Sequence, residues 1–240
     1  MPNKLISIGK AAKLLGVSID TLRRWDLARR LPSIRSGLRG HRYYRQSDID
    51  QFLQDVHSIA KKWVEDLEGS VPEQEIYCPT RDVFQARLEH FQLELARIAP
   101  IDTVSLITAV AGEIGNNSFD HNLGNWPDIG GVLFSYNLQN KSVVLADRGL
   151  GILATLKRVL PELNSADEAL KVAFTKTVSG RFPETRGNGL KFVRTIIIDN
   201  PFTLYFQTGD AYLYLKQDES DVIIQPAKTP IRGCFAIIRL

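Results

Sequence analysis

Cysteine and long apolar runs are both scarce in this chain. Among its 240 residues only Cys78 and Cys234 are cysteines, and they lack the close spacing that metal ligands show. The pair is compatible with one long-range disulfide or with two free thiols, and a reducing cytosol favours the thiols. No apolar run approaches the roughly 20 residues of a membrane-spanning helix, and the N-terminus has no apolar signal core. We therefore expect a cytoplasmic protein without a membrane partner.

Charge is unevenly distributed along the chain. The net charge is +3, with 44% hydrophobic and 24% charged residues, which is a composition typical of globular proteins. Residues 1–62 hold 13 Lys and Arg against 5 Asp and Glu, a net of +8, whereas residues 63–240 hold 17 against 22, a net of −5. This asymmetry predicts a basic head that binds a polyanion, followed by a mildly acidic body.

The basic head has the pattern of two short helices followed by a two-stranded wing over residues 31–45. Ser7 and Ser18 are suited to cap the two helices, and Gly16 permits a tight turn between them. The second helix of such a pair enters the major groove of double-stranded DNA, while neighbouring arginines bind phosphate or base edges. The residues expected to contact DNA are Ser18, Thr21, Arg23, Arg24, Arg39, His41, Arg42 and Tyr43.

The stretch 8–53 resembles the winged helix-turn-helix of the MerR and excisionase type. Residues 8–18 match the opening of that motif, residues 21–26 match its recognition helix, and residues 41–44 match the exit from its wing. The resemblance implies a DNA-binding transcription regulator that binds as a dimer through a long helix after the head.

An apolar seam follows the head. Its members are three or four residues apart, as one face of a helix requires: Ile49, Phe52, Val56, Ile59 and Trp63. The seam predicts either a homodimer through the 47–68 helix or packing of this helix on its own head. The sequence favours neither alternative over the other.

The remainder of the chain predicts a second domain over residues 81–240, separated from residues 1–68 by a linker at 69–80. Helices are expected near 81–98, 102–122 and 166–173 and from Gly187 onward, and strands are expected at 131–136, 142–146, 202–207, 211–215 and 233–239. Helices on one face of a mixed or antiparallel sheet form a two-layer α/β sandwich, so the predicted fold class is α+β.

Three polar motifs in the second domain point to a ligand site. In the first, Glu113 and Asn117 are four residues apart and share one helix face with His121, a further candidate contact to the ligand. An amide oxygen such as that of Asn117 is a ligand that Mg²⁺ accepts beside waters and phosphate oxygens. Glu113 is a candidate for organising the metal or for deprotonating a water molecule.

The other two motifs are glycine turns. Asp147 follows an apolar run, so its carboxylate is expected at the end of a buried strand, where it can accept a hydrogen bond from an adenine amino group. Gly149 and Gly151 let the chain turn without covering the base. Gly187 and Gly189 precede an apolar helix, whose first N–H groups favour phosphate. Together the three motifs predict one site for ATP and Mg²⁺.

In their order and spacing, these motifs resemble the GHKL superfamily of ATP-binding domains, which includes histidine kinases, anti-sigma-factor kinases and gyrase-type ATPases. The resemblance implies a Bergerat-type fold in which Asn117 binds Mg²⁺, Glu113 is the catalytic or metal-organising acid and Asp147 recognises adenine. It also implies a lid at 152–186 whose cations reach the phosphates: Lys176, Arg181 and Arg186. The phospho-acceptor pattern of sensor kinases is missing, so self-phosphorylation is not expected.

Two functions follow from this combination. The first is a transcription regulator in which ATP and Mg²⁺ act as a switch on DNA binding. The second is an enzyme that the head recruits to DNA, either a protein serine kinase or an ATPase of the anti-sigma-factor-kinase type, which acts on a protein partner of the STAS kind. A degenerate site that binds no nucleotide is the third possibility.

Overall fold

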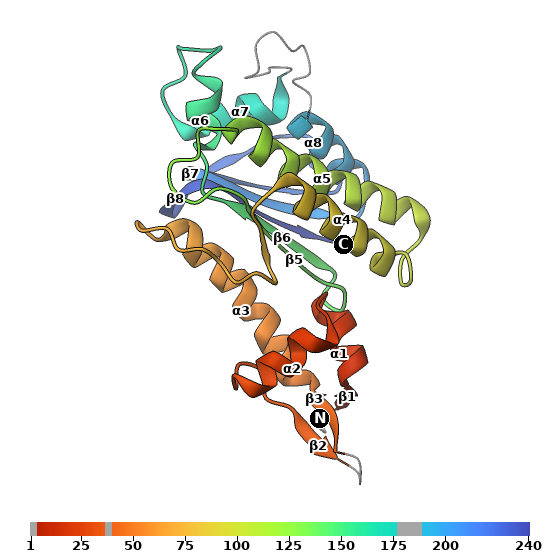
Figure 1. Cartoon of the computed structure of the whole chain (residues 1–240). Coiled ribbons are helices and arrows are strands. Elements are labelled where there is room, and N and C mark those ends of the chain that lie inside the picture. Colours follow the sequence, from red (N-terminus) through yellow and green to blue (C-terminus); the bar gives the residue numbers. More distant parts are fainter. Residues whose placement is uncertain (1–3, 37–39, 177–188) are drawn as a thin grey trace.

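The N-terminal head forms a compact winged helix-turn-helix in the computed structural model, which describes residues 4–36, 40–176 and 189–240 (Figure 1). Its elements are β1 (Leu5–Ser7), α1 (Ile8–Leu15), α2 (Ile19–Leu27), β2 (Ile34–Ser36) and β3 (His41–Arg45). The strands form an antiparallel sheet in the order β1-β3-β2. The predicted wing had two strands, and β1 adds a third because it pairs with β3 along Leu5–Ser7.

The turn between the two helices follows the predicted chemistry. Gly16 ends α1 with a φ of 65°, in the left-handed region that glycine adopts without strain. Ser18 caps α2, because its side chain accepts a hydrogen bond of 3.0 Å from the N–H of Thr21. Ser7 stands at the N-cap of α1 but makes no capping bond with its side chain.

Helix α3 (Gln46–Glu65) leaves the head and runs along the larger sheet, as Figure 1 shows. Four members of its predicted seam are buried, namely Ile49, Phe52, Val56 and Trp63, while Ile59 is 39% exposed. They pack in one cluster with the head and with strands β5, β6 and β8 of the body. The seam is therefore covered within the chain, by the head, which was one of the two alternatives, and also by the sheet, and a dimer through α3 would have to use its outer face.

The body consists of helices packed against a five-stranded antiparallel sheet. Its elements are β4 (Tyr77–Cys78), α4 (Arg81–Leu95), α5 (Ile101–Asn122), β5 (Val132–Asn137), β6 (Ser142–Asp147), α6 (Gly151–Leu156), α7 (Ala166–Thr175), α8 (Gly189–Asp199), β7 (Thr203–Lys216) and β8 (Ile224–Arg239). The strand order is β4-β5-β6-β8-β7, and each neighbouring pair is antiparallel. Two strands predicted at 202–207 and 211–215 are one strand, β7, with register shifts near Gly209.

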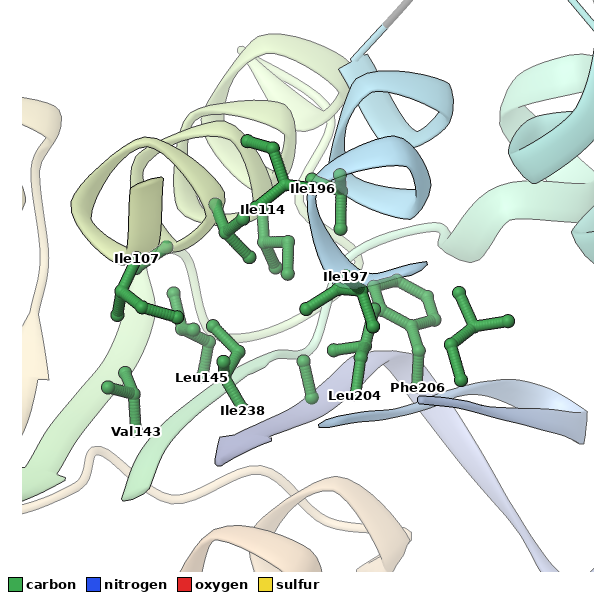
Figure 2. Packing of buried hydrophobic residues seen from close by; sticks show 14 of the residues in the cluster. Ile107, Ile114, Val143, Leu145, Ile196, Ile197, Leu204, Phe206 and Ile238 are labelled. Atoms are coloured by element: carbon green, nitrogen blue, oxygen red, sulfur yellow. The ribbon is translucent and has the colours of Figure 1, made fainter. Parts of the chain in front are cut away.

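Both faces of this sheet are buried, which explains why β5 and β6 are buried at all six positions. Residues alternate between the faces of a strand, so Val143 and Leu145 pack under α5 and α8 (Figure 2), whereas Val144 and Ala146 face α3. The helices of the body pack in one cluster on one face of the sheet, and α3 of the head covers the second face, which the sequence did not indicate. The architecture is a mixed α/β structure with the head attached to the sheet.

The segment before α4 connects the two parts closely. Within the predicted linker, Tyr77 and Cys78 form the edge strand β4, and the indole N–H of Trp63 donates to the carbonyl of Ser70 at 2.8 Å. Both cysteines are free thiols, as expected. Over the ranges described above, every helix is too short or too polar to span a bilayer.

Candidate nucleotide site and DNA-binding head

The first and third motifs lie together where α5 passes the start of α8. A β-carbon built on Gly189 would collide with the Glu113 carboxylate and lie 3.1 Å from the Asn117 amide nitrogen. Glycine at the first residue of α8 is thus what allows this helix to approach α5 so closely. The arrangement packs Glu113 and Asn117 of α5 directly against the start of α8.

The second motif is joined to the first by a hydrogen bond. The Ser118 hydroxyl, next to Asn117 in sequence, donates to Asp147 Oδ2 at 2.7 Å. The Gly149 N–H donates to Asp147 Oδ1 at 2.8 Å. Burial raises the pKa of Asp147 to about 6, and bonds from Ser118, Gly149 and the Cys234 N–H oppose this rise. Asp147 is 2% exposed at the end of β6, where the sequence predicted it.

The turn after Asp147 depends on two residues that sequence reasoning missed. Asn122 is buried, and its amide oxygen accepts a hydrogen bond of 2.7 Å from Leu150 N–H. A β-carbon on Gly149 would collide with the Asn122 side chain, so this glycine is required. Thr208 of β7 accepts from Ile152 N–H at 3.2 Å. Asn122 lies four residues after Ser118, and this helical spacing was the available signal.

The remaining predicted nucleotide contacts are only partly placed. His121 is half-buried on α5, two turns from Glu113. Lys176 is exposed just after α7, and its N–H donates to the carbonyl of Val172 at 2.8 Å. Arg181, Arg186 and Gly187 lie outside the described residues. The structure therefore brings together Glu113, Asn117, Ser118, Asp147 and Gly189, and leaves the predicted cations of the lid untested.

The donor set fits Mg²⁺ better than a transition metal. Glu113 and Asn117 carry a carboxylate and an amide, whose oxygens are hard ligands. At Gly189 the structure places the Glu113 carboxylate and the nitrogen end of the Asn117 amide, so the amide oxygen would have to turn toward a bound metal. Across the parts of the chain that the structure describes, no group of three or more His, Cys, Asp and Glu side chains is arranged for a metal. Mg²⁺ does not need such a cage, because it keeps waters and shares phosphate oxygens.

Arg148 lies between Asp147 and Gly149 of the adenine motif, and its side chain points away from the candidate nucleotide site. It is fully buried, and its guanidinium donates to the carbonyls of Trp63 and Asp66, the latter at 2.8 Å, at the C-terminal end of α3. It also donates to Asp128 Oδ2 at 2.6 Å. Burial alone would raise the pKa of Asp128, but hydrogen bonds from Arg148 and the Ile129 N–H lower it. One dipeptide, Asp147–Arg148, thus links the candidate nucleotide site to the helix that leaves the head.

In the head, the predicted DNA contacts divide into exposed and structural residues. Arg23 is exposed and pairs with Asp20 at 2.8 Å, and Ser18 is exposed at the start of α2 beside half-buried Thr21. His41 is exposed on β3, whereas Tyr43 is half-buried. Arg24 forms an ion pair with Glu75 of the body. Arg39 falls outside the described residues.

Arg42 has a structural role that the sequence did not indicate. Its Nε donates to Asp26 Oδ2 at 2.7 Å, and the N–H of Ser33 donates to Asp26 Oδ1 at 2.8 Å. Burial would raise the pKa of Asp26, but these bonds lower it. Arg42 therefore joins the wing to the end of the recognition helix, and a charge change at this residue would disturb the head as well as any DNA contact.

A basic wing beside a capped helix-turn-helix defines a winged-helix DNA-binding domain. Residues 7–44 match the MerR family regulatory proteins, which confirms the resemblance over the head. This match indicates a role in transcription regulation. Over 221 residues the chain is 25% identical to the Type II methyltransferase M.Eco47II of Escherichia coli, covering 83% of this chain and 50% of that protein. The chain thus spans about half the length of the curated relative it matches.

Proposed function

We propose that the protein is a DNA-binding transcription regulator whose body binds ATP and Mg²⁺ in the manner of GHKL domains, and that nucleotide binding changes its affinity for DNA. The observation that carries the proposal is the convergence of Glu113, Asn117 and Gly189 with Asp147, bridged by Ser118. Three segments distant in sequence meet here, and they carry groups of the kinds that bind a nucleotide and its metal, which supports the proposal. Bound ATP would supply the negative phosphates that complete the coordination of the metal.

The proposed switch has a physical route through α3. Asp147 belongs to the nucleotide site, and Arg148 holds the end of α3 through the carbonyls of Trp63 and Asp66. A shift of this dipeptide on nucleotide binding moves the contacts at one end of α3, and the head is attached to the other end. Ligand coupling of this kind requires different nucleotide affinities for two arrangements.

The test is DNA affinity measured with and without ATP and Mg²⁺. We expect a change of about fivefold or more, which is the lower end of typical allosteric coupling. The probe is a labelled duplex recovered by selection from random DNA, followed by fluorescence anisotropy, with association state measured by sedimentation. Equal DNA affinity and equal association state with and without nucleotide would contradict the switch.

A second candidate is a protein kinase or ATPase that the head recruits to DNA, acting on a protein partner such as a STAS domain. The Glu113 carboxylate beside Gly189 favours it, because an acid at the phosphate end of the site is suited to act as a base.

Glu113→Gln separates the two candidates. The substitution keeps the size of the side chain but removes the base, so we expect ATP binding to be retained and any ATP turnover to fall by about 10² or more. Turnover is measured by phosphate release and binding by calorimetry, with the exposed Glu89→Gln as the matched control. If the wild-type protein shows no ATP turnover, with or without a protein partner, the enzyme candidate is contradicted and nucleotide sensing is the function that remains.

A further inference from the structure

A cavity of about 330 Å³ lies at the junction between the recognition helix and the body. The head contributes Ser18, Thr21 and Arg24, and helix α4 of the body contributes Arg87 and His90. Three of the predicted DNA contacts therefore share one concave surface with two basic or titratable side chains that the sequence analysis did not connect with DNA.

Neutral backbone acceptors hold the side chain of Arg87 in place and do not cancel its positive charge. Its guanidinium donates to the backbone carbonyls of Gln74 and Glu75, which are neutral acceptors. Arg24 pairs with the Glu75 carboxylate, yet its side chain remains 61% exposed. The two arginines against one glutamate leave a net positive charge in the cavity, and His90 beside them is exposed. Such a surface attracts an anion.

The wall of the cavity also contains a tyrosine, Tyr136. Tyr136 lines the cavity and is 6% exposed, and its buried hydroxyl has no hydrogen-bond partner among the residues that the structure describes. A buried hydroxyl without a hydrogen-bond partner is unfavourable. An anion seated in the cavity supplies acceptors for such donors.

The position of the cavity identifies the anion. Figure 1 shows strands β2 and β3 of the wing at the end of the head farthest from the body. The cavity is lined by residues of the head and of the body, so it lies where the two meet. A recognition helix in the major groove is held by phosphate contacts on either side of it. We propose that this cavity receives a backbone phosphate of the bound duplex, so that Arg87 and His90 of the body extend the DNA interface; this inference rests on the proposed DNA-binding function.

The experiment measures duplex affinity against salt concentration by fluorescence anisotropy. The probe is a labelled duplex of about 30 base pairs in roughly 50 to 200 mM potassium chloride. Arg87→Gln should lower affinity about tenfold, the effect of losing one charge-assisted hydrogen bond, and should reduce the log–log salt slope by about 0.9. Lys216→Gln, which removes an exposed cation outside the cavity, is the control.

Further variants keep the proposal falsifiable. Arg87→Gln also removes hydrogen bonds to two backbone carbonyls, so its effect on charge has to be separated from its effect on structure. Arg87→Lys retains the charge, and we expect it to restore most of the salt slope. Equal slopes for wild type and Arg87→Gln, with affinity lowered by Arg23→Gln, would confine DNA to the head and overturn the inference alone. A wild type that binds no duplex would overturn the DNA-binding function itself. Saturable binding of inorganic phosphate that is lost in Arg87→Gln, without any change in DNA slope, would assign the cavity to free phosphate and also overturn the inference.

Discussion

Asp147→Asn is expected to lower the affinity for ATP and Mg²⁺ by about tenfold to a hundredfold. A charged hydrogen bond contributes about 1.5–3 kcal/mol, and the amide would present an N–H₂ group to at least one donor that now faces the carboxylate. Those donors are the Ser118 hydroxyl and the Gly149 N–H. Isothermal titration calorimetry measures the loss, with the exposed Asp210→Asn as the matched control. Tight binding retained by the Asp147 variant would contradict its assignment to adenine.

The same substitution should change how stability depends on pH. Burial raises the pKa of Asp147 from 3.8 to about 6, so the folded protein holds a proton that the unfolded chain has released. The stabilisation from this group is therefore complete below about pH 4 and is lost as the pH rises through about 6. We expect the difference in unfolding free energy between wild type and Asp147→Asn to vary across this window. A constant difference would show that the carboxyl titrates normally.

Arg148→Gln is expected to lower the free energy of unfolding by about 3–5 kcal/mol. The variant leaves Asp128, whose side chain is 20% exposed, without its main partner and removes the buried donor to the carbonyls of Trp63 and Asp66. Urea denaturation followed by circular dichroism measures the change. Arg232→Gln is the matched control, because Arg232 also contacts Asp128, at 3.4 Å, but its side chain is 44% exposed. The control should lose less than about 1 kcal/mol.

Equal losses in these two variants would show that the buried position of Arg148 adds nothing. If Arg148→Lys folds, it provides a milder test of the proposed switch. Lysine retains the charge but has no planar fork, so it cannot satisfy the carbonyls of α3 and Asp128 together. We expect its ATP affinity to resemble that of wild type, while the effect of ATP on DNA affinity becomes smaller.

Local chemistry was predictable where it depends on neighbours in sequence. Ser18 caps its helix as its position before the second helix indicated, and Asp147 ends a buried strand as its apolar run indicated. The spacing of Glu113 and Asn117 placed both on one helix face, and Gly189 of α8 packs against that face. Helix faces, caps and turns depend on residues a few positions apart, so they can be predicted from the amino-acid sequence.

Long-range packing was not predictable in the same way. The seam of α3 showed that one face would be covered, but an apolar face does not specify its partner, and strands β5, β6 and β8 are distant in sequence. Asn122 and Thr208 were missed because their bonds to the turn at 149–152 depend on how α5 and β7 meet it. Arg42 was predicted to contact DNA from its charge and Arg148 was assigned no role, whereas the partners of these two side chains define what they do.

The position of α3 limits how this protein can be divided or recombined. Its inner side chains and those of Val144, Ala146 and Phe235 form a single hydrophobic cluster with the interior of the head. Cutting the chain after Glu65 would keep the helix with the head and leave those sheet residues facing water. A chimera with a different DNA-binding head therefore has to retain α3 of this chain and join the new head before Gln46. The inner face of α3 must then fit both the new head and the sheet.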